Sequence, residues 1–317
     1  MLLNGLPVRK KPMESPSKHH FSPAFSLKPW AGTDGNVCQM RKIAGKIVPR
    51  RTHPNATGFE KDLYRIDGIR PGEAQYVETN FFKPLDTAAE LALQKILSGD
   101  RSPWDGPTRS AWTRYILSLM FRMPTTVDAL KSHIAEMWKE GIKALEADYE
   151  NRRLPTDPQS FAEYFALTNP AAPQIGAANM LMQIIDNDRV GPTIFDMHWS
   201  WIPLPKANVE LLCSDRPIDR PLGFDNPRAY IALAVAPRVL FLAARDEGLA
   251  KTISANNHTE MVKRMNKTVV TQAREFVWGS NDSQLHFVSR HLGSAPEREL
   301  ITPEQRAQAI AAATGKA

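Results

Sequence analysis

The spacing of apolar residues changes near residue 190, and this change limits the possible folds more than any other feature of the chain. Between 84 and 150, apolar residues recur every three to four positions, which is the period of an α-helix. From 193 to 201 (TIFDMHWSW) they alternate with polar residues, which is the period of a β-strand. Since the helical and strand patterns occupy separate stretches, we expect an α+β fold, a helical centre packed with a mostly antiparallel sheet.

The best-marked helix lies in the middle of the chain. Its apolar stripe consists of Trp112, Tyr115, Ile116, Leu119 and Met120. Pro124 should end it, because the residue before a proline is pushed out of the helical region. We expect the helix 111–123 to lie at the centre of the fold, with Trp112, Ile116 and Leu119 buried.

Further elements follow from the same two periods. One helix is expected to begin at residue 84, and three others are expected over 126–150, 176–188 and 258–277. The expected strands lie within 37–50 and at 63–67, 193–201, 209–215, 230–235 and 239–244. We expect a disordered basic arm over 1–17, one globular domain over 18–295, and a C-terminal helix or tail over 296–317.

Composition excludes several classes of protein. The 317 residues are 42% hydrophobic and 23% charged, which is typical of a soluble globular protein. The sequence has no apolar run long enough for a membrane helix, and its start lacks the apolar core of a signal peptide. Two cysteines, Cys38 and Cys213, are too few for a disulfide framework. We therefore expect a cytoplasmic protein without a membrane partner. The net charge of +6 permits a nucleic-acid partner without requiring one.

Histidines and carboxylates with the chemistry of an acid–base or metal site are spread along the chain. These candidates are His19, His20, Glu78, Asp86 and Asp215. A hydrolytic site with a divalent metal would need several of them to converge on one point. Each also has a structural interpretation. His20 could donate to a backbone carbonyl, and Asp86 lies in a first helical turn, where negative charge is favourable.

Two arginines on the central helix have a similar pair of interpretations. Arg114 and Arg122 could line a site for a phosphate or carboxylate. Alternatively, they could dock helices by pairing with an acid. The candidate acids are Glu78, Asp86 and Glu90.

The end of the predicted strand 209–215 presents the same choice. Asp215 could be a ligand or base, or it could cap a turn by accepting backbone amides. Cys213 is better explained as a buried strand residue than as a nucleophile, because the sequence places no activating histidine beside it. Gly-rich phosphate loops, GxSxG, HExxH and CxxC pairs are absent from the sequence.

Three separated signatures carry a family resemblance: the block KHHFSPAFSLKPW at 18–30, the helix end RMP at 122–124, and CSDRP at 213–217. In this order they resemble a mostly bacterial family, the domain-of-unknown-function family numbered 4238. The matching positions are His19, His20, Pro23, Phe25, Glu78, Asp86, Arg122, Pro124, Ser214, Asp215, Pro217, Asn266 and 274–277. Where the family often has a tyrosine-leucine pair, this chain has Ser26-Leu27. The resemblance implies a shared fold and brings no established activity.

Two functional hypotheses follow. The first is a metal-assisted phosphodiester hydrolase, a nuclease or toxin-like effector, with His19, His20, Glu78, Asp86, Arg122 and Asp215 as its catalytic residues. The second is a non-enzymatic interaction or binding protein whose signatures hold the fold. Convergence of these side chains on one cleft would favour the hydrolase. Internal pairing of the same side chains would favour the interaction protein.

Overall fold

The computed structural model describes residues 17–296 together with 304, 307, 308 and 311. The arm expected over 1–17 and the C-terminal helix or tail expected over 296–317 lie almost wholly outside these residues. Within the described part of the chain, no helix is both long enough and apolar enough to cross a membrane.

The helical centre is built around α3 (Gly106–Phe121), as expected from its apolar stripe. The Asp105 side chain caps its start by accepting the amide of Thr108 at 2.7 Å. Trp112, Ile116 and Leu119 are all buried, which confirms the expected central position. This helix packs against α2 (Lys83–Leu97), α6 (Ala172–Ile185) and α7 (Val190–Asp196), and α4 (Pro124–Arg152), the next helix along the chain, packs against α6.

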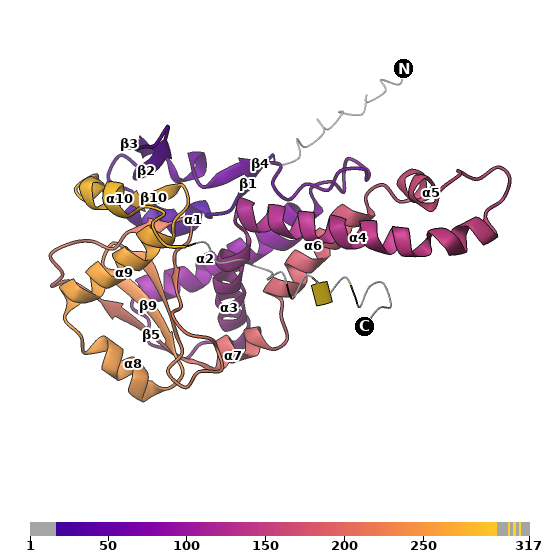
Figure 1. Ribbon diagram of the computed structural model, residues 1–317. Coiled ribbons are helices and arrows are strands. Elements are labelled where there is room, and N and C mark those ends of the chain that lie inside the picture. The colour runs from indigo at the N-terminus through magenta and orange to yellow at the C-terminus, as the bar shows by residue number, and fades with distance from the viewer. Residues whose placement is uncertain (1–16, 297–303, 305–306, 309–310, 312–317) are drawn as a thin grey trace, which may run out of the picture.

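The strands form antiparallel sheets, which confirms the α+β class (Figure 1). One sheet has the order β3-β2-β10-β6 and contains Lys46–Thr52, Val37–Ile43, Phe276–Gly279 and Cys213–Ser214. A second has the order β5-β9-β8-β7 and contains His198–Pro203, Val239–Ala244, Tyr230–Ala236 and Ile218–Asp219. A small pair joins β1 (Lys18–His20) to β4 (Phe59–Lys61).

One further long helix, α9 (His258–Gln272), precedes β10 in the chain. The remaining helices are short: α1 (Ala24–Leu27), η1 (Lys28–Trp30), η2 (Pro54–Ala56), η3 (Val77–Phe82), α5 (Phe161–Thr168), α7 (Val190–Asp196), α8 (Glu247–Ser254) and α10 (Leu285–His291). Figure 1 shows α4 running outward from the body of the molecule, with α5 beside its far end.

Two expected strands differ from the structure. Residues 193–201 do not form one strand, because the chain is helical through α7 and becomes a strand only at His198. The Trp199 indole folds back and donates to the carbonyl of Ile194 at 2.9 Å, which fixes this change of direction. Both Trp199 and Trp201 are buried core residues, as their apolar face suggested.

The other expected strand, 209–215, is reduced to Cys213–Ser214. The preceding amides are used elsewhere: Leu211 donates to Pro237, and Leu212 donates to the side chain of Asn266. Residues 63–67 form turns instead of a strand.

The expected helix 258–277 was too long. The helix α9 stops at Gln272, and Phe276 begins the inner strand β10. The expected helices around 126–150 and 176–188 are present with shifted bounds, as α4 and α6.

Candidate functional site

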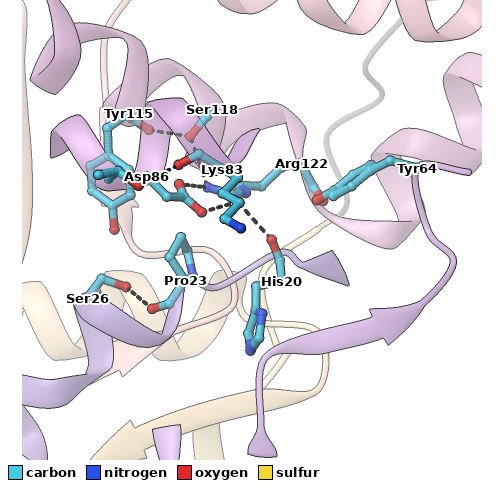
Figure 2. A network of polar contacts seen from close by, with 10 residues as sticks. His20, Pro23, Ser26, Tyr64, Lys83, Asp86, Tyr115, Ser118 and Arg122 are labelled. Atoms are coloured by element: carbon cyan, nitrogen blue, oxygen red, sulfur yellow. Dashed lines mark hydrogen bonds and ion pairs between the residues drawn. The ribbon is translucent and has the colours of Figure 1, made fainter. Parts of the chain in front are cut away.

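A buried ion pair joins the second and third helices at the centre of the candidate site. Asp86 lies in the first turn of α2, and Arg122 is the residue that follows the last turn of α3. The two terminal guanidinium nitrogens of Arg122 donate to the two Asp86 oxygens at 2.8 and 2.9 Å (Figure 2). The Arg122 side chain is 1% exposed and the Asp86 side chain 22%. Of the three candidate acids, Asp86 therefore pairs with Arg122, in the two-pronged geometry that arginine favours.

Arg122 also ties two further segments to this pair. Its guanidinium donates to the backbone carbonyl of His20 at 2.8 Å, and its own carbonyl accepts the hydroxyl of Tyr64 at 2.8 Å. The guanidinium lies 4.6 Å from the centre of the Phe82 ring. Burial lowers the pKa of Arg122, but the Asp86 carboxylate outweighs this effect and raises the pKa above its ordinary value. The arginine therefore stays charged and holds four parts of the chain together.

The paired histidines have different surroundings. His19 is fully buried, its Nδ1 accepts the amide of Tyr64 at 2.9 Å, and its ring stacks on the Tyr64 ring. The His20 ring points away from the ion pair, so that only its carbonyl faces Arg122 (Figure 2). Burial, helped by the charges of Arg122 and Lys18, lowers the pKa of His20 to about 4. The backbone of Asn55 opposes this shift, and the Nε2 atom of the ring is buried with no hydrogen-bond partner among the described residues.

Glu78 is the least satisfied acid of the site. It lies in η3, a π-helical turn, and such turns are rare and frequent at functional sites. Burial raises the pKa of Glu78 to about 7, while the Arg122 charge lowers it and the Asp86 charge raises it. Its Oε2 atom is buried and has no hydrogen-bond partner among the described residues. Glu78 can therefore gain or lose a proton near neutral pH.

Asp215 is not part of this hydrogen-bond network and has a structural role. It is 1% exposed, and its oxygens accept the amides of Arg274, Glu275 and Phe276 at 2.7 to 3.2 Å. Burial raises the pKa of Asp215, while these amides lower it. The cap was expected within the turn that follows Asp215, but it is made on the distant start of β10. None of these hydrogen bonds reaches Arg122 or Asp86.

The remaining candidate residues are also accounted for by the fold. Arg114 pairs with Asp186 at 2.5 and 2.9 Å, and not with one of the three expected acids. Burial raises the pKa of Cys213 to about 12, so this strand thiol is a poor nucleophile. Within the described residues, no three His, Cys, Asp or Glu side chains are grouped so that they could hold a metal ion.

The sequence reasoning missed Tyr64, which is central to the network. Its hydroxyl binds the Arg122 carbonyl, its amide binds His19, and its ring packs on Phe82 at 4.4 Å. Burial raises the pKa of Tyr64, so the phenol stays protonated and able to donate. In the sequence, Tyr64 was noted only as part of the segment LYRID, which was predicted to be a strand and gave no sign of a role in the site.

Comparison with known proteins identifies the family. Residues 18–283 match the family model described as "Protein of unknown function (DUF4238)". The chain belongs to this family. A search of curated proteins and a search of solved structures found no match. In this family member, the opening signature, the acid of α2 and the RMP helix end meet in one network, while the CSDRP signature binds β10.

Proposed function

We propose that this member of the family is a non-enzymatic interaction protein whose signatures hold the fold. One observation carries the proposal: the charged side chains of Arg122 and Asp215 are buried and hydrogen-bonded to other groups of the protein itself. The terminal nitrogens of Arg122 bind Asp86 and the His20 carbonyl, and the oxygens of Asp215 bind three backbone amides.

Energetics supports the same conclusion. Removing one partner from a buried ion pair costs about 3–5 kcal/mol, because the other charge is left without compensation. A substrate phosphate that displaced Asp86 would compensate the charge of Arg122 but would leave the Asp86 carboxylate without its partner. A network of this kind is better suited to fixing the signatures in place than to exchanging ligands.

A second candidate remains, and Glu78 is the observation that favours it. It is the metal-assisted phosphodiester hydrolase, with nucleic acid as its substrate and partner. An acid with a pKa near 7 suits general acid–base catalysis. The charge of Asp86 acts on Glu78, and in this candidate function the two carboxylates would hold a divalent metal together with phosphate oxygens of the substrate.

We also propose a cytoplasmic location for either candidate. Both cysteines, Cys38 and Cys213, are buried free thiols. Free thiols are typical of proteins in a reducing compartment.

A cleavage assay separates the two candidates. The purified full chain is incubated with DNA or RNA and with Mg²⁺, Mn²⁺ or Zn²⁺, beside the variants Glu78→Gln and Arg122→Met. The interaction protein predicts no cleavage by the wild-type chain under any of these conditions. Cleavage that is lost in Glu78→Gln, with an unchanged circular dichroism spectrum, would establish the hydrolase instead.

A further inference from the structure

Positive charge is concentrated in the first strands of the chain. Residues 18–61 contain eight Lys and Arg against two Asp and Glu, so their net charge of +6 equals that of the whole 317-residue chain. This segment forms β1, β2, β3 and β4. A charge asymmetry of this kind within one chain suggests a polyanionic partner, a nucleic acid or a membrane surface.

Most of these eight cations have no acid beside them. Lys28, Arg41 and Arg51 each pair with a carboxylate. The other five are exposed and form no ion pair with any residue that the structure describes: Lys18, Lys42, Lys46, Arg50 and Lys61. Their charge is therefore available to an external anion.

Two of the five cations lie directly opposite each other. In the register of β1 and β4, Lys18 lies across from Lys61, whereas the acid of these two strands, Glu60, lies across from His19. Since side chains alternate along a strand, Glu60 is on the other face and does not separate the two lysines. Like charges at directly opposite positions destabilise a pair of strands. An anion bound between Lys18 and Lys61 would remove this repulsion.

Lys46 and Arg50 extend the positive charge along β3, which is an edge strand of its sheet. Four residues separate them, so they are on one face and about 13 Å apart. Gln39 lies across from Arg50 and accepts the hydroxyl of Thr57, two residues before β4, so this face looks toward the β1–β4 pair. Figure 1 shows both ribbons along the upper side of the molecule. We call the four cations Lys18, Lys46, Arg50 and Lys61 the basic surface.

The other exposed side chains nearby select duplex DNA among the polyanions. Within residues 17–61, Ile43 and Val48 are the only large apolar side chains that are exposed, and no Phe, Tyr or Trp is. Single-stranded nucleic acid is held by exposed aromatic rings, and a membrane surface by Trp, Phe or Leu. A duplex needs only cations placed along its phosphates.

The tip of the β2–β3 hairpin gives the surface a shape that fits the same partner. All five residues from 42 to 46 are exposed. A two-stranded ribbon enters the major groove of B-DNA, whereas the major groove of duplex RNA is too deep and narrow.

We propose that this chain binds the phosphate backbone of double-stranded DNA through the basic surface, with the tip of the β2–β3 hairpin in the major groove. The proposal rests on the interaction function and names DNA as the partner. Binding is independent of base sequence, because the basic surface contacts phosphates.

The test measures binding of the purified full chain to a short fluorescent DNA duplex by anisotropy, in EDTA and over about 50–200 mM salt. Lys46→Gln/Arg50→Gln removes two cations of the basic surface. Lys139→Gln/Lys143→Gln is the matched control, since these are two exposed lysines four residues apart on α4 and the loss of net charge is the same. Lys61→Gln removes one member of the like-charged pair.

We expect a wild-type dissociation constant of roughly 1–100 µM near physiological salt, with a slope of about −3.6 for the logarithm of the binding constant against the logarithm of the salt concentration. In Lys46→Gln/Arg50→Gln the dissociation constant should rise at least about tenfold and the slope should shrink by about 1.8, whereas the α4 control should match the wild type in both.

Lys61→Gln separates a binding role from a folding role. It should weaken DNA binding and shrink the slope by about 0.9, because one phosphate contact is lost. Its thermal midpoint should stay at or above that of the wild type, because the repulsion with Lys18 is relieved. A lysine that served only the fold would not move the two measurements in this way.

Absence of DNA binding at about 50 mM salt would overturn the proposal, as would binding that the basic-surface variants leave unchanged or that the α4 control weakens equally. Tighter binding to phosphatidylserine vesicles, to duplex RNA or to single-stranded DNA of the same sequence would also overturn it, because the surface would then serve another partner. Each of these results leaves the interaction function standing, whereas metal-dependent cleavage would remove that function and leave binding in EDTA untouched.

Discussion

The ion pair between Asp86 and Arg122 should behave as one energetic unit, and a double-mutant cycle can show it. The variants are Asp86→Asn, Arg122→Met and the double variant. Methionine keeps much of the apolar stem that packs on Phe82 while it removes the charge and the donors. Asparagine keeps the size of the acid while it removes its charge.

The exposure of the two partners sets the expected order of the effects. Asp86→Asn leaves a full positive charge on a side chain that is 1% exposed, so we expect a loss of about 3–5 kcal/mol in the free energy of unfolding. Arg122→Met leaves Asp86, which is 22% exposed and can keep some water, but it also strips the donor from the His20 carbonyl. We expect this variant to lose about 2–4 kcal/mol. The double variant leaves no uncompensated charge, so its loss should be at least about 1 kcal/mol smaller than the sum of the single losses.

Urea unfolding followed by circular dichroism measures these free energies. Thermal unfolding provides a second measurement, because each kcal/mol lowers the midpoint by about 2–4 °C in a domain of 150–250 residues. Two results would refute the reasoning: single variants that each cost less than about 1 kcal/mol, or a double variant whose loss equals the sum of the single losses.

Three further predictions concern Glu78, Asp215 and the β2–β3 turn. Burial raises the pKa of Glu78 from 4.5 to about 7, so ionisation of Glu78 destabilises the fold as the pH rises through this range. The variant Glu78→Gln should therefore be more stable than the wild type above pH 7 but not below pH 4.5. Urea unfolding of both proteins at several pH values measures the difference in their free energies of unfolding. His20 titrates in both proteins, so its opposite effect on stability drops out of this difference. A difference that does not change with pH would contradict the prediction. Asp215→Asn should cost about 3 kcal/mol by the same method, because the amide nitrogen would face backbone donors, and wild-type stability would exclude the capping role. Ala44 and Gly45 both have positive φ, 46° and 81°, and asparagine followed by glycine is the preferred pair in such a hairpin turn. Ala44→Asn should therefore stabilise the protein by about 0.5–1 kcal/mol, whereas Gly45→Ala should destabilise it. The opposite order of thermal midpoints would contradict this prediction.

Local patterns in the sequence were sufficient for the parts of the fold that depend on near neighbours. The apolar stripe of α3 predicted a buried central helix, because residues three and four apart lie on one face whatever the rest of the chain does. Pro124 marked the junction of α3 and α4 for an equally local reason. The segment around Ala44-Gly45 was predicted as a pair of short strands, and it is the β2–β3 hairpin.

Tertiary structure alone decided where elements end and which groups meet. The pattern of α9 continues to 277, but the carboxylate of Asp215 binds the amides of 274–276, and the chain turns into the sheet. From the sequence, Glu78, Asp86 and Glu90 were all candidate acids for an arginine of the central helix, and the packing of α2 on α3 brings Asp86 to Arg122. The same packing buried Glu78 without a partner for one oxygen and raised its pKa. Periodicity is a property of neighbouring residues, whereas burial and the choice of a partner depend on segments brought together from distant parts of the chain, here 36 residues apart for Arg122 and Asp86.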